Sequence, residues 1–468
     1  MDLSPAASLR SRITVALGRA ARLVSRLRGG GSGGTALPGL VVEKTDPGFL
    51  ARTLGQLPMG VIVVSGTNGK TTTTKMVVQL LREQGLTVLT NRSGSNFVRG
   101  VLASLLTEVD AGGRVHHDVA VLELDEAHAV RFVRLVKPRH ALLLNVMRDQ
   151  LDRFGEIDYT ASLLHKVALT TTGSVVVNAD DPRLGAASFI GDLRARVAAF
   201  GAGEALRALF VSDDDLRTGA RAQEPRASGA AKEAGEEGAP VPQAPAALAP
   251  RVSLESLRGQ DAVVRVDGAD HDVTFTIPGI HNQLNACAAL AVALEALGDR
   301  ADLPGLLTTL ARVQAAFGRG EVLALDGRDV QLSLVKNPAG FRMGLLTAAE
   351  AVRSGGPESV MIAINDEYAD GRDMSWLWDV EFAGLRAEGV AVVTGVRAWD
   401  MALRLRYDEV PVGTVEPDLT RAVELLREAA GKADDGAGRP MRIFTTYTAM
   451  LALRAHLAEL TDVEEALT

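Results

Sequence analysis

Residues 61–74 are Val-Ile-Val-Val-Ser-Gly-Thr-Asn-Gly-Lys-Thr-Thr-Thr-Thr, and this stretch decides how the rest of the chain is interpreted. The β-branched run predicts a buried strand, the glycines predict a tight turn, and the next residues predict a helix. Backbone N–H groups in such a turn can face a polyphosphate, while the lysine and the following hydroxyl can hold its oxygens and Mg²⁺. The general pattern has a glycine where this chain has Val64, so only the shorter form Gly66-x-x-Gly69-Lys70-Thr71 is present. The stretch predicts nucleotide binding, with an ordinary glycine turn as the alternative.

The composition limits what kind of protein this is. A chain of 468 residues is expected to form about two or three domains. Hydrophobic residues make up 47% and aromatic residues only 4%, which indicates globular cores built from Ala, Val and Leu. The net charge of −8 argues against a nucleic-acid partner. Cys287 is the single cysteine, so disulfides within the chain are excluded and a cytoplasmic location is expected.

The N-terminus predicts a basic amphipathic helix. Apolar residues alternate with six arginines, which are Arg10, Arg12, Arg19, Arg22, Arg26 and Arg28. No run of about 18 apolar residues exists, so no membrane-spanning helix is expected. The helix could lie on an anionic membrane surface or pack against its own domain, and packing is the commoner arrangement. With the glycine-rich linker after it, this helix makes residues 1–36 a first unit.

Beyond residue 37, buried strands alternate with amphipathic helices in two successive α/β patterns. Residues 37–316 predict a parallel sheet covered on both faces, and residues 317–468 predict a second, Rossmann-like unit without a phosphate loop. About 215–250 is expected to be a disordered insertion, because residues 217–240 contain no large apolar side chain. Strands are predicted at 61–64, 88–90, 119–123, 140–145, 174–178, 197–200, 261–266, 271–277, 330–335, 360–364, 390–394 and 442–445. Helices are predicted at 72–84, 98–106, 127–136, 159–170, 341–353, 376–388, 419–430 and 448–459, with an Ala-rich helix ending at 297.

Polar side chains accumulate where these strands end, which is where open α/β sheets bind ligands. Glu123 ends a buried strand and is a candidate Mg²⁺ ligand, because Mg²⁺ prefers one or two carboxylates plus phosphate and water. Asp125 and Glu126 are interpreted instead as residues that cap the next helix. Asn145 follows the next strand.

Six motifs occur in the order and approximate spacing of the Mur ligase family, which the chain resembles from about residue 40 to 460. They are Gly66–Thr72, Glu123, Asn145 with Arg148-Asp149-x-Leu151-Asp152, Asn178-Ala179-Asp180-Asp181-Pro182, His281-Asn282-x-x-Asn285, and Phe317-Gly318-Arg319-Gly320-Glu321. The resemblance implies an α/β fold with a Mur ligase-like central P-loop ATPase domain and a C-terminal Rossmann-like domain. It also implies that ATP converts a carboxylate into an acyl phosphate, which an amine then attacks.

Three further motifs narrow the resemblance to the branch that supplies synthetase subunits of lipid II isoglutaminyl synthases. The pointers are Asn91-Arg92-x-Gly94-Ser95-Asn96, Lys336-Asn337-Pro338-Ala339-Gly340-Phe341 and the run from Asn365 to Asp379. Members that add amino acids carry an Asp-Tyr-Ala-His type sequence in place of Lys336–Ala339. The branch implies amidation of the D-glutamate α-carboxylate of lipid II, with ammonia from a partner glutaminase, GatD, at the cytoplasmic face of the membrane.

The resemblance also assigns roles to individual residues. The residues that would bind the triphosphate are Gly66, Thr67, Asn68, Gly69, Lys70, Thr71, Thr72 and Arg319, and Asn282 would lie near the adenine. Thr71 and Glu123 would bind Mg²⁺, and Lys70 and Glu123 would be catalytic. The residues that would bind the substrate are Asn91, Arg92, Ser95 and Asn96. Asp370 or Asp373 would complete the Cys-His pair of the partner. Zinc is not expected, because the four-cysteine ribbon common in this family is replaced by the 215–250 insertion.

Two other functions stay open. One is an autonomous Mur or folylpolyglutamate-type ligase that adds an amino acid. The other is a nucleotide-binding scaffold without activity, against which the joint presence of Lys70, Thr71 and Glu123 speaks.

Overall fold

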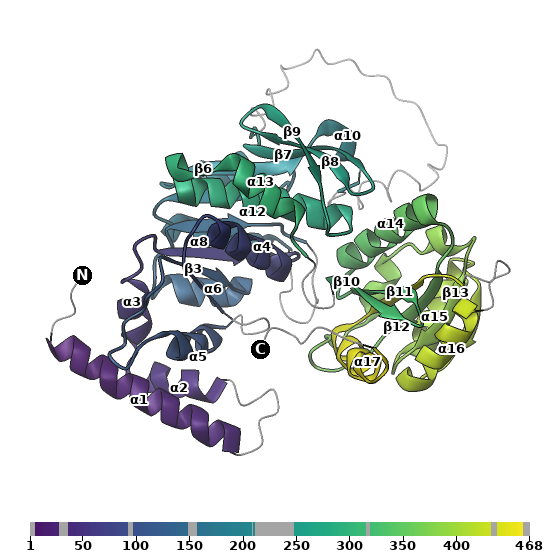
Figure 1. Ribbon diagram of the computed structural model, residues 1–468, viewed down its shortest axis with the longest axis horizontal. Coiled ribbons are helices and arrows are strands. Elements are labelled where there is room, and N and C mark those ends of the chain that lie inside the picture. The colour runs from purple at the N-terminus through teal and green to yellow at the C-terminus, as the bar shows by residue number, and fades with distance from the viewer. Residues whose placement is uncertain are drawn as a thin grey trace, which may run out of the picture.

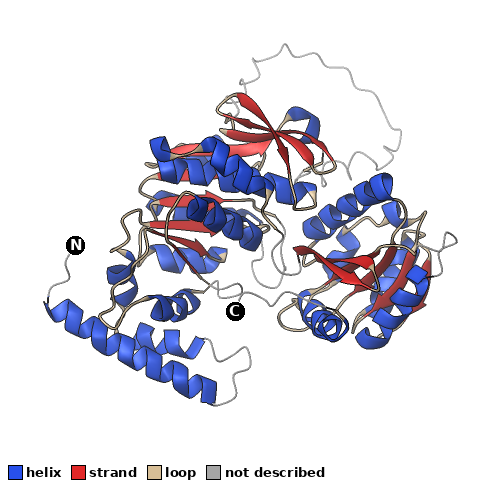
Figure 2. Ribbon diagram, in the orientation of Figure 1, coloured by secondary structure: helices blue, strands red, loops and turns tan. Residues whose placement is uncertain are grey.

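The computed structural model describes residues 5–27, 36–91, 97–147, 157–207, 209–210, 248–314, 319–431 and 438–461. Two α/β units lie side by side, each built on its own sheet (Figures 1 and 2). Several sequence predictions fall outside the described residues. They are the substrate residues Arg92, Ser95 and Asn96, the motif at 148–152, and the insertion at 215–250 except for its last three residues.

The first sheet carries the phosphate loop, and its described strands follow the order β2-β3-β1-β4-β5-β6-β7-β8-β9. The strands are β1 (Val61–Ser65), β2 (Val88–Thr90), β3 (Val119–Glu123), β4 (His140–Leu143), β5 (Ser174–Asn178), β6 (Arg196–Ala202), β7 (Val252–Arg258), β8 (Asp261–Val266) and β9 (Ala269–Thr274). Neighbours from β2 to β7 are parallel, as predicted, whereas β8 and β9 form an antiparallel hairpin on the β7 edge. Strand β7 was not predicted, because its second half is polar and a bulge after Leu254 breaks its alternation.

Helices cover both faces of the first sheet, which explains why its central strands are apolar throughout. One face packs against α4 (Lys70–Glu83), α12 (Ile280–Leu297) and α13 (Leu303–Ala311). The other packs against α2 (Ala36–Thr45), α3 (Phe49–Leu54), α5 (Val98–Glu108), α6 (Glu126–Val133) and α8 (Ile157–Thr170). The short elements α9 (Ala187–Ile190), α10 (Glu204–Arg207) and η2 (Gly298–Arg300) lie in connections.

The second sheet has the order β10-β11-β15-β12-β13-β14. Its strands are β10 (Arg319–Leu325), β11 (Arg328–Leu334), β12 (Ser359–Ala363), β13 (Val390–Thr394), β14 (Val412–Val415) and β15 (Met441–Thr445). All neighbours are parallel except the β10–β11 pair. One face packs against α14 (Pro338–Gly355) and α15 (Ala398–Tyr407), and the other against α16 (Leu419–Gly431) and α17 (Tyr447–Leu460).

The predicted helix at 376–388 is wrong. The segment forms two short 3₁₀ turns, η3 (Ser375–Asp379) and η4 (Ala383–Leu385), joined by extended residues. The Arg404 guanidinium donates hydrogen bonds to the carbonyls of Leu377 and Val380, at 3.2 and 2.6 Å. These contacts from α15 satisfy carbonyl groups that a continuous helix would have used internally, so tertiary structure overrides local propensity. The sequence also did not predict β10, β14 or α15.

The N-terminal helix α1 (Pro5–Leu27) packs along α2 and α5 on the outer side of the first unit (Figure 1). The described helices include none whose length and apolar character would let it cross a bilayer.

Candidate active site

The phosphate loop joins the end of β1 to the start of α4 at the carboxyl edge of the first sheet. Gly66 has a φ of +130°, and a Cβ atom there would lie 3.0 Å from both the main-chain nitrogen and oxygen of Asn145. Only glycine therefore allows the loop to pass so close to the chain that leaves β4.

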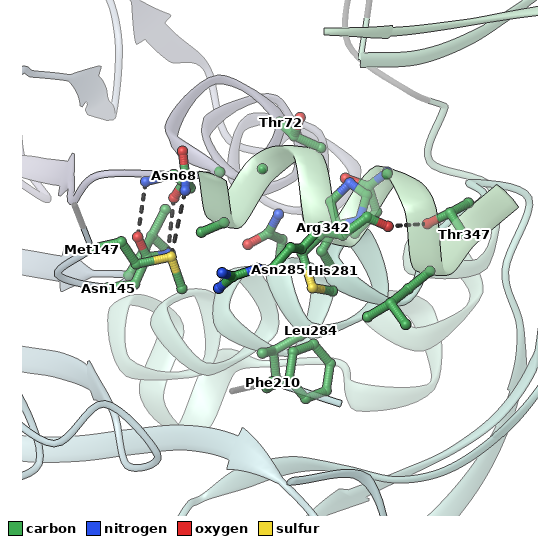
Figure 3. A pocket seen from close by; sticks show the side chains of 18 of the residues that line it. Asn68, Thr72, Asn145, Met147, Phe210, His281, Leu284, Asn285, Arg342 and Thr347 are labelled. Atoms are coloured by element: carbon green, nitrogen blue, oxygen red, sulfur yellow. Dashed lines mark hydrogen bonds between the residues drawn. The ribbon is translucent and has the colours of Figure 1, made fainter. Parts of the chain in front are cut away.

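Asn145 fixes the shape of the loop. Its side-chain oxygen accepts a hydrogen bond from the backbone N–H of Asn68 at 2.8 Å, and its Nδ2 donates to the Asn68 carbonyl at 3.1 Å (Figure 3). Its own carbonyl accepts from the backbone N–H of Thr67 at 3.0 Å. The family resemblance included Asn145 without a role, and the structure assigns it the role of holding the loop.

Lys70 is buried at the start of α4 and faces two carboxylates. Its Nζ donates to the Gly66 carbonyl at 2.6 Å and lies 3.6 Å from Asp125 Oδ1 and 3.7 Å from Glu126 Oε2. Asp125 occupies the N-cap position of α6 and Glu126 lies in its first turn, as predicted, but the Asp125 side chain makes no capping hydrogen bond. The carboxylates of Asp125 and Glu126 face Lys70.

Burial and nearby charges shift the pKa values of these two carboxyl groups in opposite directions. Burial raises the pKa of Glu126. Burial would also raise the pKa of Asp125, but the Lys70 ammonium, the hydrogen bond with Glu126 and the charge of Lys336 together hold that pKa below its usual value. The two carboxyl groups therefore differ in acidity, and both lie within 4 Å of the Lys70 side-chain nitrogen.

Thr71 and Glu123 meet beside the loop, with Thr71 Oγ1 donating to Glu123 Oε1 at 2.9 Å. Two hard oxygen donors in contact fit Mg²⁺, which takes few protein ligands. Among the described residues, no group of three or more His, Cys, Asp or Glu side chains could hold a metal ion.

Asn91 holds the main chain of Glu123. Its Nδ2 donates to the Glu123 carbonyl, and its Oδ1 accepts from the Glu123 N–H, both at 2.9 Å. This pairing fixes the end of β3 and makes Asn91 a positioning residue for the carboxylate. Its predicted contact with substrate stays a prediction.

The second unit closes over the loop through the start of α14. Lys336 Nζ donates to the Thr67 carbonyl at 3.1 Å. The amides of Asn68 and Asn337 pair reciprocally, at 3.3 and 3.0 Å, and Asn337 Oδ1 also accepts from the Gly340 N–H to cap α14. In the sequence, Lys336 and Asn337 were recognised only as a difference from the amino-acid-adding enzymes, and no contact with the phosphate loop was predicted for them.

A cavity of about 250 Å³ opens between α12 and α14, next to the loop. Asn68, Gly69 and Thr72 line its phosphate-loop end, whereas Phe210 and Leu284 line an apolar region (Figure 3). A polar end beside a phosphate loop and an apolar end of this kind suit a nucleotide.

Asn282 and Arg319 were both predicted to bind the nucleotide. Asn282 lines the cavity, and its Nδ2 donates to the Pro278 carbonyl at 2.7 Å. The backbone of Arg319 pairs in the sheet with Ser333, which also lines the cavity, and the described structure does not include the Arg319 side chain.

The other candidate residues lie elsewhere. Asp370 and Asp373 occupy the loop after β12 and do not line the cavity. Cys287 is buried inside α12, and burial raises the pKa of its thiol to about 12. A thiol that stays protonated in this way is not a nucleophile.

Two protein families match the chain, the Mur ligase middle domain over residues 64–293 and the MurT ligase C-terminal domain over residues 334–450. The chain is 30% identical over 460 residues to the lipid II isoglutaminyl synthase (glutamine-hydrolyzing) subunit MurT of Streptococcus pneumoniae, covering 96% of this chain and 98% of that protein. It is 27% identical over 450 residues to the protein of the same name from Staphylococcus aureus, covering 90% and 94%. Among solved structures, MurF ligase from Thermotoga maritima in complex with ADP is similar in fold, with a TM-score of 0.62 and 17% identity, covering 88% of this chain and 84% of that one.

We expect Lys70→Ala to slow ATP hydrolysis on the order of 10³-fold, because it removes the only lysine of the phosphate loop. Lys166→Ala is the matched control, since Lys166 is exposed on α8 and should leave hydrolysis unchanged. Phosphate release reports the rate, and circular dichroism reports the fold. Hydrolysis that survives Lys70→Ala would favour a scaffold without activity.

Proposed function

This chain belongs to the Mur ligase family, in its MurT branch, and from that premise we propose that it is the synthetase subunit of a lipid II isoglutaminyl synthase in peptidoglycan synthesis. The observation that carries the proposal is the convergence of Lys70, Thr71 and Glu123 at one edge of the sheet. These residues are the ones that an enzyme needs to transfer a phosphoryl group from ATP. The similar MurF structure in complex with ADP supports ATP as the nucleotide.

The first chemical step would form an acyl phosphate. A carboxylate oxygen of the substrate attacks the γ-phosphorus of ATP, the bond to the β-γ bridging oxygen breaks, and ADP leaves. Charge builds up on the transferring oxygens, and the Lys70 ammonium and the loop N–H groups are placed to offset it. Mg²⁺ held by Thr71 and Glu123 would neutralise further charge on the phosphate oxygens. Lys336 adds a second ammonium group at the Thr67 carbonyl.

The second step would use ammonia. Its lone pair attacks the carbonyl carbon of the acyl phosphate, phosphate leaves with the bonding electrons, and a proton is lost to give the amide. This step needs no nucleophile from the protein, in accord with a Cys287 thiol that is buried and protonated. Ammonia would come from a glutaminase subunit, GatD. The substrate is the D-glutamate α-carboxylate of lipid II, which would be met at the cytoplasmic face of the membrane.

The complex with a candidate glutaminase, supplied with lipid II, ATP and Mg²⁺, tests the function directly. We expect either glutamine or ammonium salts to support conversion of one carboxylate to an amide, detected by mass spectrometry of the stem peptide. A free amino acid should not be incorporated. Incorporation of an amino acid would identify an autonomous ligase, and no product from either nitrogen source would contradict the proposal.

The two aspartates that could complete the active site of the partner differ in how deeply they are buried. Both Asp370 carboxylate oxygens accept hydrogen bonds from Thr448, at 2.7 and 2.5 Å, and the side chain is buried. Asp373 is only half-buried, and hydrogen bonds from Ser375 hold its pKa below the usual value, so it is ionised at neutral pH. We assign the partner-facing role to Asp373 and a structural role to Asp370.

We expect Asp373→Asn to lower glutamine-dependent amidation by about 10³-fold or more, because the asparagine cannot hold a partner imidazolium. Amidation from ammonium salts should stay at the level of the unmodified chain, since synthetase residues are untouched. Asp370→Asn is the comparison variant, and we expect it to lower the melting temperature instead. A normal glutamine-dependent rate in Asp373→Asn would contradict the assignment.

The C-terminal unit presents an aromatic surface that includes Trp378, which follows Asp373 closely in the sequence. Trp399, Leu403 and Tyr407 repeat every four residues on α15 and are 67, 50 and 69% exposed. Trp378 packs against Tyr407 with ring centroids 5.1 Å apart and is itself half-exposed. Exposed aromatic side chains gathered in this way are typical of protein interfaces. This aromatic surface is therefore our proposed docking face for the glutaminase.

We expect Trp399→Ala/Tyr407→Ala to weaken binding of the glutaminase by about 10- to 100-fold, as loss of central aromatic contacts does in other interfaces. Isothermal titration calorimetry of the two purified subunits measures the affinity. Leu169→Ala/Leu451→Ala, which alters exposed leucines on α8 and α17, is the control. Unchanged affinity in the aromatic variant would place the partner elsewhere.

A further inference from the structure

Helix α1 approaches the first unit through its small and polar residues. Ser11, Thr14 and Val15 are buried against the domain. Gly18 lies so close to α5 that a Cβ atom there would be 2.6 Å from Leu106 Cδ1. Because this face fits so tightly, α1 can turn only this side toward the first unit.

Hydrogen bonds and ion pairs hold the same face in place. Thr14 Oγ1 donates to Asp46 Oδ2 at 2.9 Å, and Arg10 Nε lies 3.0 Å from Asp46 Oδ1. One turn further on, Arg19 Nη2 donates to the Val109 carbonyl at 2.7 Å. Thr14 and Asp46 are both buried, so the hydrogen bond between them is shielded from water and helps to fix how the helix is rotated.

Five large apolar residues of α1 point away from the domain, whereas Val15 faces it. Leu9, Ile13, Leu17, Leu23 and Val24 are 61, 54, 45, 61 and 44% exposed. At about 100° per residue they fall on one side of the helix, opposite Ser11 and Gly18. We call these five residues the outer stripe. An amphipathic helix that only packs on its own domain buries its leucines and isoleucines, and α1 does the reverse.

Charge points to what covers the outer stripe. Arg12 and Arg19 border it on one side and Arg10 on the other, and all three are exposed although Arg10 and Arg19 also contact the domain. Residues 5–27 contain five arginines and no acidic residue, although the whole chain has a net charge of −8. An apolar stripe between arginines is the form of helix that lies in the interface of an anionic lipid bilayer.

We propose that the outer stripe of α1 docks the protein on an anionic membrane surface, with the helix lying in the plane of the headgroups. Helix α5 would connect that surface to the candidate active site. Its last turn contacts Gly18, and its first residue, Val98, lies seven positions after Asn91, which holds Glu123. This proposal rests on the geometry of α1 and does not depend on the proposed function.

Sedimentation with vesicles tests the proposal on the full chain. We expect the protein to bind vesicles that contain phosphatidylglycerol and not vesicles of phosphatidylcholine alone, with binding that weakens as salt is raised. Ile13→Ser/Leu17→Ser should lower the partition coefficient by about tenfold or more. Leu169→Ser/Leu451→Ser alters two exposed leucines on α8 and α17 and should bind like the unmodified chain.

Circular dichroism and ATP hydrolysis in solution show whether the stripe variant remains folded, and both should be unchanged. Equal binding by the stripe variant and the unmodified chain, or no binding by either, would overturn the proposal. Analytical ultracentrifugation without vesicles tests the alternative that a second copy of the chain covers the outer stripe. A dimer that the stripe substitutions dissociate would show that the outer stripe joins two copies of the chain, and that result would also overturn it.

Discussion

The phosphate loop is held from two sides by paired amides, and the geometry of the site depends on this. Asn145 bonds to both the backbone N–H and the carbonyl of Asn68, and Asn337 from the other unit pairs with the Asn68 side chain. Because Asn337 also caps α14, movement of the second unit acts directly on the loop. The cavity between α12 and α14 thus exists in this form only while the two units are together.

Charge inside the site is balanced before any nucleotide binds. Lys70 is buried, and the carboxyl groups of Asp125 and Glu126 lie opposite it. A buried charge is tolerated only where opposite charges lie close to it, and both carboxylates lie within 4 Å of the Lys70 side-chain nitrogen. The same ammonium can then transfer its interaction to phosphate oxygens. Asn91 supports the site in another way. It bonds only to the Glu123 main chain in these contacts, while the Glu123 carboxylate accepts a hydrogen bond from Thr71.

Local patterns in the sequence predicted the strand, loop and helix around Gly66, a parallel arrangement of strands and a site shared by Thr71 and Glu123. Each of these depends on residues near in sequence or on the rule that ligands gather at the carboxyl ends of strands. The roles of Asp125, Asn145 and Asn337 could not be predicted, because they arise from contacts between distant segments. The failed helix at 376–388 has the same cause, since Arg404 takes up its carbonyl groups from another element.

The central claim is that this site activates a carboxylate as an acyl phosphate. Labelling both oxygens of the substrate carboxylate with ¹⁸O tests it most directly, in the complete enzyme with lipid II, ATP and an ammonia source. In an acyl phosphate mechanism one labelled oxygen leaves with the phosphoryl group when ammonia attacks. We therefore predict one ¹⁸O atom in the inorganic phosphate released for each amide formed. Amide formation with unlabelled phosphate would contradict the account.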